Sequence, residues 1–258
     1  DFVPDDKLKI AYAPSFGKSS ISPQAAEIIK PLINRFQFLS AREIQGVKIL
    51  KELTTKSVSM VVDPVFLLNT SQWDDICSER LINEKYIFCY FLGADENYKK
   101  NILELKQKTG FITVTFPFAT TEQPLNYDFL SCDVNLPDAS PSDFISLIKN
   151  AEYVLTDSFH ATAFSLIFNK QFYTLKRYND NDKESMNSRL LSILGLLNLE
   201  GRLLDTRESN KIDINNSINY DTIDNQLASF INGSYEYLSN SLNSNPNYLT
   251  AERLKNEN

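Results

Sequence analysis

The chain has 258 residues, which is enough for one large domain or two compact ones. Hydrophobic residues make up 42% and charged residues 23%, a balance that excludes a disordered, collagen-like or coiled-coil protein. The 26 Lys and Arg against 33 Asp and Glu give a net charge of −7, so the overall field does not favour nucleic acid or an anionic membrane surface as a partner. An anionic ligand would need a few local cations to hold it.

Three further features of the sequence bear on its location and on metals. The longest central stretch without charged or amide side chains, 86–94, is far shorter than the roughly 20 residues that cross a bilayer. Three widely spaced cysteines are typical of a reducing compartment, so we expect a cytoplasmic protein. One histidine and no CxxC exclude a Cys/His zinc site and leave open a Mg²⁺ held by carboxylates. The chain begins at Asp1 and enters a strand-like run almost at once, which indicates a fragment or a processed start.

The first part of the chain alternates apolar runs of strand length with segments of helical period. Strands are predicted at 9–13, 38–39 and 58–62. Helices are predicted at 23–36, where Ser22 and Pro23 form a capped start, and at 43–53. An irregular segment, 71–85, carries the only Trp and separates this part from the next.

The second part repeats the alternation, which predicts an α/β fold with parallel sheets. Its predicted strands are 86–92, 111–116, 153–155 and 171–175, and its predicted helices are 96–108, 142–150, 161–168, 189–197 and a long terminal one, 223–242. We expect a first lobe over 1–80, a second over 81–242 and a polar tail over 243–258. Periodicity alone leaves open a single six-stranded sheet.

Several common nucleotide and nucleophile motifs are absent. The sequence contains no GxGxxG and no GxxxxGK[ST], which disfavours an NAD enzyme and an NTPase. It also lacks GxSxG, the usual strand-to-helix serine nucleophile.

The segment 156–160 joins the end of a predicted strand to the start of a predicted helix, where ligands bind in open α/β sheets. Backbone N–H groups at a helix start attract phosphate or carboxylate, and Ser158 can donate to an anion. The competing interpretation, which the local sequence alone favours, is that Asp157 or Ser158 caps the helix and His160 packs locally. The functional interpretation gains weight because His160 is the only histidine, the residue type that exchanges protons near neutral pH.

Three other residues could bind a substrate. Arg42 follows a predicted strand and can fork onto a carboxylate or phosphate, or it can form a surface salt bridge with Glu43 or with a helix carboxylate. Ser15 lies in a strand-end loop that backbone groups could present to a ligand or that could be a plain turn. Arg189 could line a cleft or be solvated, as most surface arginines are.

Five segments, taken in order, resemble the polysaccharide pyruvyl transferase family. They are KIAYAPSFG at 9–17, SAREIQG at 40–46, DPVFLL at 63–68 with Trp73, TDSFHA at 156–161 and MNSR at 186–189. They span roughly the first three quarters of the chain. The resemblance implies two Rossmann-like lobes facing a cleft, similar to GT-B glycosyltransferases.

The resemblance also implies an activity: transfer of pyruvate from phosphoenolpyruvate to a sugar of a cell-surface polysaccharide or its lipid-linked precursor, as a ketal. No cofactor is then needed, and a lipid-linked acceptor would bring the protein to the inner face of the membrane. His160 is the expected general acid/base, and Arg42, Ser158, Ser15 and Arg189 are the expected substrate-binding residues. The helix start at 158–160 and Arg42 would hold the two ends of phosphoenolpyruvate.

The chain departs from the family pattern in two places. The family's segments ahead of residue 9, with a Gly-Ser-Asp loop, have no counterpart here, so we expect an incomplete first lobe and poor activity of this chain alone. Ser158 also stands where some members carry a basic residue. Two other functions stay open: a GT-B glycosyltransferase using a nucleotide sugar, and a non-catalytic carbohydrate-binding lobe.

Overall fold

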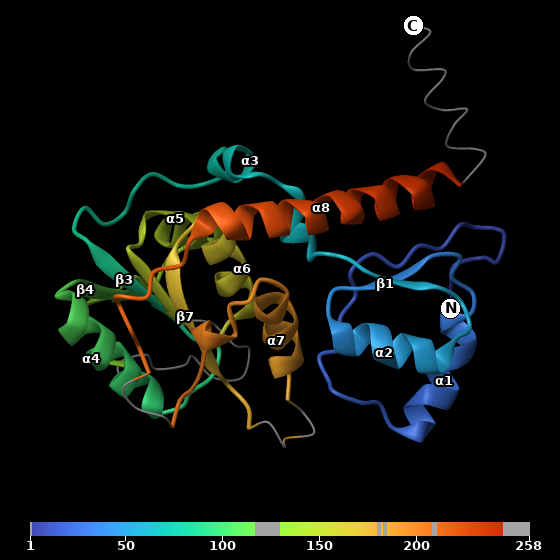
Figure 1. Ribbon diagram of the computed structural model, residues 1–258, viewed down its shortest axis with the longest axis horizontal. Helices are drawn as coiled ribbons and strands as arrows, with labels where there is room; N and C mark the ends of the chain where they lie inside the picture. Colours follow the sequence, from blue (N-terminus) through green and yellow to red (C-terminus); the bar gives the residue numbers. More distant parts are fainter. Residues whose placement is uncertain (1, 117–129, 180–181, 183–184, 208–210, 245–258) are drawn as a thin grey trace, which may run out of the picture. The chain divides into compact units, whose positions relative to one another are not determined.

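The computed structural model describes residues 2–116, 130–179, 182, 185–207 and 211–244 (Figure 1). Its contacts divide the chain into two compact units, each discontinuous in sequence. The first unit comprises residues 1–67, 181–193 and 223–258, and the second comprises 68–180 and 194–222. Among the described helices, none is both long enough and apolar enough to cross a membrane.

The second unit is built on a six-stranded sheet in the order β5-β4-β3-β6-β7-β8. All of its neighbouring strands run parallel. The strands are β3 (Tyr86–Tyr90), β4 (Ile112–Thr115), β5 (Val134–Asn135), β6 (Tyr153–Thr156), β7 (Gln171–Lys176) and β8 (Leu203–Asp205). Because the strands are parallel, their carboxyl ends meet at one edge of the sheet, where α/β folds place ligands.

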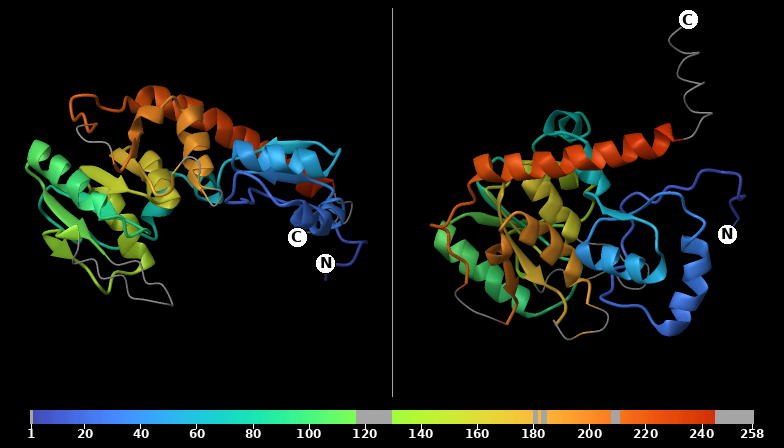
Figure 2. Two further views of the ribbon diagram at one scale, coloured as in Figure 1. Left: turned by 90° about the horizontal axis from the view of Figure 1, so that it is seen from below. Right: turned by 45° about the vertical axis from the view of Figure 1, so that its right-hand side comes forward.

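Helices cover both faces of this sheet, which explains why its strands are apolar on both sides (Figures 1 and 2). On one face, Ile87 and Cys89 of β3 pack with Ile102 of α4 (Asn97–Thr109). On the other face, the rings of Phe88 and Tyr90 contact Phe144 of α5 (Pro141–Asn150).

Local capping sets the limits of these helices. The helix α5 begins with a capping box formed by Ser140 and Asp143, and Pro141 occupies its first position. Ser158 caps α6 (Phe159–Ile167), and Gly110, in the left-handed conformation at φ +73°, ends α4. The remaining elements of this unit are α3 (Thr70–Asp74) and the 3₁₀ helix η3 (Glu200–Arg202).

The first unit holds a two-stranded parallel sheet of β1 (Leu39–Ala41) and β2 (Val58–Met60). Its helices are α1 (Pro23–Ile33) and α2 (Ile44–Leu53), with the 3₁₀ turn η1 (Pro64–Leu67) after β2. Two more helices, α7 (Asn187–Leu196) and α8 (Tyr220–Asn243), lie mostly in this unit.

The expected α/β class with parallel sheets is confirmed, and two separate sheets replace the alternative of a single one. The expected strand over 9–13 is wrong beyond one residue, because only Ile10 pairs, in a single parallel bridge to Phe38. The Ser40 hydroxyl takes the place of a longer ladder: it accepts from the Ala13 N–H at 2.9 Å and donates to the Ala11 carbonyl at 2.6 Å.

Other expectations differ in detail. The helix expected at 161–168 begins at Phe159, which places His160 in its first turn. The helix expected to reach 36 ends at Ile33, and α3, which begins at Thr70, overlaps the start of the segment 71–85 expected to be irregular. The strands β5 and β8 are too short, at two and three residues, to produce a periodic signal. Of the expected polar tail, residues 245–258 lie outside the described part of the chain.

Candidate functional site

The second unit presents His160 at the carboxyl edge of its sheet. The strand β6 ends at Thr156, and α6 begins three residues later. His160 is exposed in the first turn of α6, with its ring edge-on to Phe159 at a centroid distance of 5.4 Å. The Ser158 oxygen accepts from the Ala161 N–H and so caps the helix. A ligand approaching this helix start would meet the imidazole at the surface.

The neighbouring Asp157 is not a cap, because its buried carboxylate binds groups from three other elements. It accepts hydrogen bonds from the backbone N–H groups of Leu92 and Gly93, which follow β3, at 2.7 and 2.9 Å. It also accepts from the Tyr98 hydroxyl of α4 at 2.8 Å and from the Arg177 Nε, just after β7, at 3.0 Å. Asp157 therefore fixes the loop that carries His160 to the strand ends on either side.

Gly93 permits this convergence. A Cβ built on Gly93 would lie 2.9 Å from the Tyr98 hydroxyl oxygen, 3.1 Å from an Asp157 carboxylate oxygen and 3.2 Å from the Arg177 Cγ. No side chain larger than a hydrogen fits there without moving the groups that hold Asp157.

In the first unit, an ion pair joins the ends of the two strands. Arg42 follows β1, and its Nη1 donates to the carboxylate of Asp63, which follows β2. The Arg42 side chain is 15% exposed and that of Asp63 is 2% exposed. The Arg42 Nε also lies 3.8 Å from a carboxylate oxygen of Glu43. Arg42 therefore does form a salt bridge, as one of the two interpretations expected. The ion pair is largely buried rather than on the surface, and the carboxylate that accepts the hydrogen bond is that of Asp63.

Ser15 is bound to the buried carboxylate of Glu43. Its hydroxyl donates to Glu43 Oε1 at 2.9 Å, and the Phe16 N–H donates to the same oxygen at 3.1 Å. The Ser15 oxygen in turn accepts from the N–H of Gly17, whose φ of +61° suits glycine. The loop 13–17 is therefore an ordered turn tied to the start of α2.

The segment that carries Arg189 reaches the same region from far along the sequence. The Met186 Sδ would lie 3.6 Å from a Cβ on Gly17, and the Arg189 Nη2 lies 3.3 Å from that sulfur. The Ser192 hydroxyl oxygen of α7 accepts from the Ile44 N–H at the start of α2. The structure thus brings together Ser15, Arg42 and Arg189 within the first unit, whereas Ser158 and His160 belong to the second.

Within the part of the chain that the structure describes, no three His, Cys, Asp or Glu side chains lie together as metal ligands would. The carboxylates of Glu43 and Asp63 pair with Arg42 instead.

Comparison with known proteins gives the family. The family model described as polysaccharide pyruvyl transferase matches residues 1–180. This chain belongs to the polysaccharide pyruvyl transferase family. The match covers the loop of Ser15, the strand end of Arg42 and the helix start that carries His160. No curated protein matches the chain.

Solved structures are similar at low identity. The UDP-GlcNAc 2-epimerase from Neisseria meningitidis, bound to UDP-GlcNAc, is 16% identical over 81% of this chain and 56% of that one, with a TM-score of 0.42. The UDP-GlcNAc 2-epimerase from Methanocaldococcus jannaschii is 13% identical over 78% and 56%, with a TM-score of 0.43. The wall teichoic acid polymerase TagF is 12% identical over 97% and 64%, with a TM-score of 0.43. This pyruvyl transferase family member thus spans only 56% to 64% of these three chains.

The sequence analysis of this family member did not identify the residues that hold Arg42 and Asp157 in place, namely Asp63 for Arg42, and Gly93 and Arg177 for Asp157. Gly93 directly follows a buried apolar strand in a chain with only seven glycines, a signal that could have marked a close approach of groups. Asp63 and Arg177 likewise follow strands, but nothing local in the sequence pairs them with Arg42 and Asp157.

We expect Gly93→Ala to destabilise the second unit by about 1–3 kcal/mol, the usual range for overpacking, because the new methyl group would displace Tyr98 or Arg177 from Asp157. Gly201→Ala is the matched control, since a Cβ there meets nothing within 4 Å, and it should change stability by less than about 0.5 kcal/mol. Urea unfolding measures both, and equal stabilities for the two variants would contradict the close-approach role of Gly93.

We expect stability to fall as the pH rises above about 10, the ordinary tyrosine pKa. Burial raises the pKa of Tyr98, with Asp157 adding to the shift, and burial also raises the pKa of Tyr12 to about 12. These hydroxyls keep their protons in the folded state and lose them in the unfolded chain, so alkaline pH favours unfolding. Tyr98→Phe removes one such proton and should flatten the decline by up to about 1.4 kcal/mol per pH unit. Urea unfolding from pH 9 to 11 is the measurement, and identical slopes for both proteins would contradict the assignment.

Proposed function

We propose that this chain is part of an enzyme that transfers the pyruvyl group of phosphoenolpyruvate to two hydroxyls of a sugar in a polysaccharide or its precursor. The observation that carries the proposal is the family match over residues 1–180, which includes the helix start where His160 is exposed. Transfer of this kind needs a proton donor and acceptor at the reacting carbons and a site for an anionic donor.

The reaction sets the task for His160. The methylene carbon of phosphoenolpyruvate gains a proton, the adjacent carbon gains a bond to a sugar hydroxyl oxygen, and its bond to the phosphate oxygen breaks. A second hydroxyl of the same sugar then closes the ketal ring at that carbon. Of the two hydroxyl protons released, one balances the proton on the new methyl group and the other leaves with phosphate. We propose that His160 carries the proton, since histidine ordinarily changes charge near neutral pH.

Two further groups suit an anionic donor, each within its own unit. The Ser158 oxygen uses a lone pair to cap α6, so its O–H can still donate to a phosphate or carboxylate at the helix start. The Arg42 guanidinium, held by Asp63, offers a charged and partly exposed group at the strand ends of the first unit. For Ser15, whose hydroxyl already donates to Glu43, we propose a positioning role, and Arg189 is proposed to extend the cationic surface beside it.

The test of His160 uses the whole natural protein. The assay measures the phosphate released from phosphoenolpyruvate in the presence of sugar acceptors. His160→Ala should lower turnover by roughly a hundredfold or more, the range for general acid/base catalysis, without a change in melting temperature because the side chain is exposed. His160→Asn, which hydrogen-bonds but does not exchange protons near neutrality, should not restore activity. Near-normal turnover of His160→Asn, with the limb of the pH–rate profile near neutral pH intact, would contradict the catalytic role of His160. Consumption of a nucleotide sugar in place of phosphoenolpyruvate would favour a glycosyltransferase.

The test of Arg42 is a change that keeps the charge. Arg42→Lys should weaken phosphoenolpyruvate binding by about 1.5–3 kcal/mol, because an ammonium does not reproduce the two parallel hydrogen bonds of a guanidinium. Calorimetric titration measures this affinity. Arg35→Lys, in the same unit and paired with Asp5, is the matched control and should bind normally. Asp63→Asn separates the roles: if Arg42 is only structural, both Arg42→Lys and Asp63→Asn lower the melting temperature, and neither alters the affinity.

A further inference from the structure

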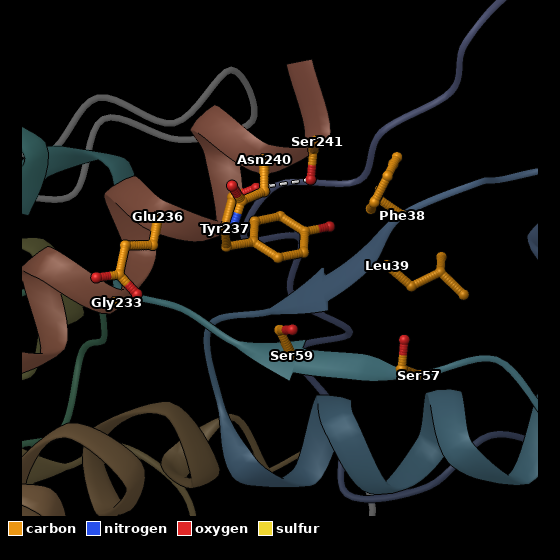
Figure 3. Close-up of a pocket in the computed structure, with 9 residues that line it drawn as sticks. All are labelled: Phe38, Leu39, Ser57, Ser59, Gly233, Glu236, Tyr237, Asn240 and Ser241. Atoms are coloured by element: carbon orange, nitrogen blue, oxygen red, sulfur yellow. Dashed lines mark hydrogen bonds between the residues drawn. The ribbon is translucent and has the colours of Figure 1, made fainter. Parts of the chain in front are cut away.

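A pocket of about 310 Å³ lies in the first unit, between α8 and the two-stranded sheet (Figure 3). Its volume is at the lower end of the range for small-molecule sites. Its walls come from the β1 and β2 strand region and from one side of α8: Phe38, Leu39, Ser57, Ser59, Gly233, Glu236, Tyr237, Asn240 and Ser241. Neither Arg42 nor His160 is among these residues, although Leu39 belongs to β1, the strand that Arg42 follows.

Four polar side chains of this pocket have no hydrogen-bond partner among the described residues. They are two hydroxyls on one wall and a carboxylate and an amide on the other: Ser57, Ser59, Glu236 and Asn240. Ser57 and Ser59 are two positions apart along the β2 region and so point to the same side of the sheet. A ligand could therefore receive hydrogen bonds from both walls of the pocket.

An aromatic ring lies between these two walls. Tyr237 projects from α8 toward the strands, above Ser59 (Figure 3). Its hydroxyl donates to the Ala11 carbonyl at 2.9 Å, which fixes the orientation of the ring. A fixed ring face offers apolar contact to the C–H groups of a flat ligand.

The charge of the lining restricts the class of ligand. Among the described residues that line the pocket, Glu236 is the only charged one, and none is Lys or Arg. Phosphate or carboxylate groups would meet repulsion without a compensating cation, so phosphoenolpyruvate does not suit this pocket.

Gly233 keeps one end of the pocket open. A glycine in the middle of a helix is less stable than alanine, yet a Cβ at Gly233 would meet nothing within 4 Å. Packing therefore gives no reason for glycine at this position. A larger side chain there would project toward open space beside Tyr237 and Asn240.

We propose that this pocket binds one uncharged sugar ring, stacked on Tyr237 and hydrogen-bonded by Ser59 and Asn240. A hydroxyl-rich ring of this kind provides donors and acceptors to both walls and an apolar face to the aromatic ring, and it carries no charge that Glu236 would repel. The site is separate from the residues assigned to pyruvyl transfer and does not depend on that reaction.

The experiment titrates the full chain, labelled with ¹⁵N, with the methyl β-glycosides of glucose, galactose and N-acetylglucosamine. At least one glycoside should shift amide signals in 57–59 and 233–241. Asn240→Ala and Ser59→Ala should each weaken its binding by roughly 3- to 10-fold, the effect of one lost hydrogen bond. Asn232→Ala, exposed on the same helix outside the pocket, is the matched control and should bind normally.

A second variant, Gly233→Phe, should fill the pocket and abolish these shifts while leaving the melting temperature within a few degrees of the parent chain. Three results would each overturn the proposal: no shifts with any of the three glycosides, shifts elsewhere that survive Gly233→Phe, or the same pocket shifts produced by phosphoenolpyruvate. Retained binding in both Asn240→Ala and Ser59→Ala would also overturn it.

Discussion

The carboxylate of Asp157 holds together the edge of the second unit's sheet where His160 is presented. It receives hydrogen bonds from the chain leaving β3, from α4 and from the chain leaving β7. A buried carboxylate is stable only when its oxygens are satisfied, and this one accepts from two backbone N–H groups, a hydroxyl and a guanidinium. The position of α6, and with it the position of His160, depends on this set of bonds.

In the first unit too, buried carboxylates join the segments that meet at the strand ends. Arg42 and Asp63 join the ends of β1 and β2, and Glu43 ties the turn of Ser15 to the start of α2. Here the cation retains some exposure while both carboxylates are buried. Charges anchored in this way lose little conformational freedom on binding a ligand, which favours their use in recognition.

The helix start at 158–160 in the second unit and the pocket beside α8 in the first unit differ chemically. The helix start carries the exposed His160 that we propose for proton transfer, whereas the described lining of the pocket beside α8 offers an aromatic ring, unpaired polar groups and one negative charge. The proposed anionic donor requires positive charge, which Arg42 offers elsewhere in the first unit, whereas the sugar proposed for the pocket requires neutral hydrogen bonds.

The sequence by itself determined the α/β class, most helices and strands, a helix cap at Asp157 or Ser158 and the family segments, because these depend on residues close together in the chain. It did not determine that Asp157 binds Arg177 and Tyr98, nor that Met186 meets the loop at Gly17. It also misjudged the strand expected at 9–13, where backbone pairing is limited to the bridge at Ile10 and the Ser40 hydroxyl bonds Ala11 and Ala13 instead. Only the tertiary structure decided these contacts, because spacing along one chain predicts local periods, whereas the pairing of buried polar groups depends on which distant strand ends meet.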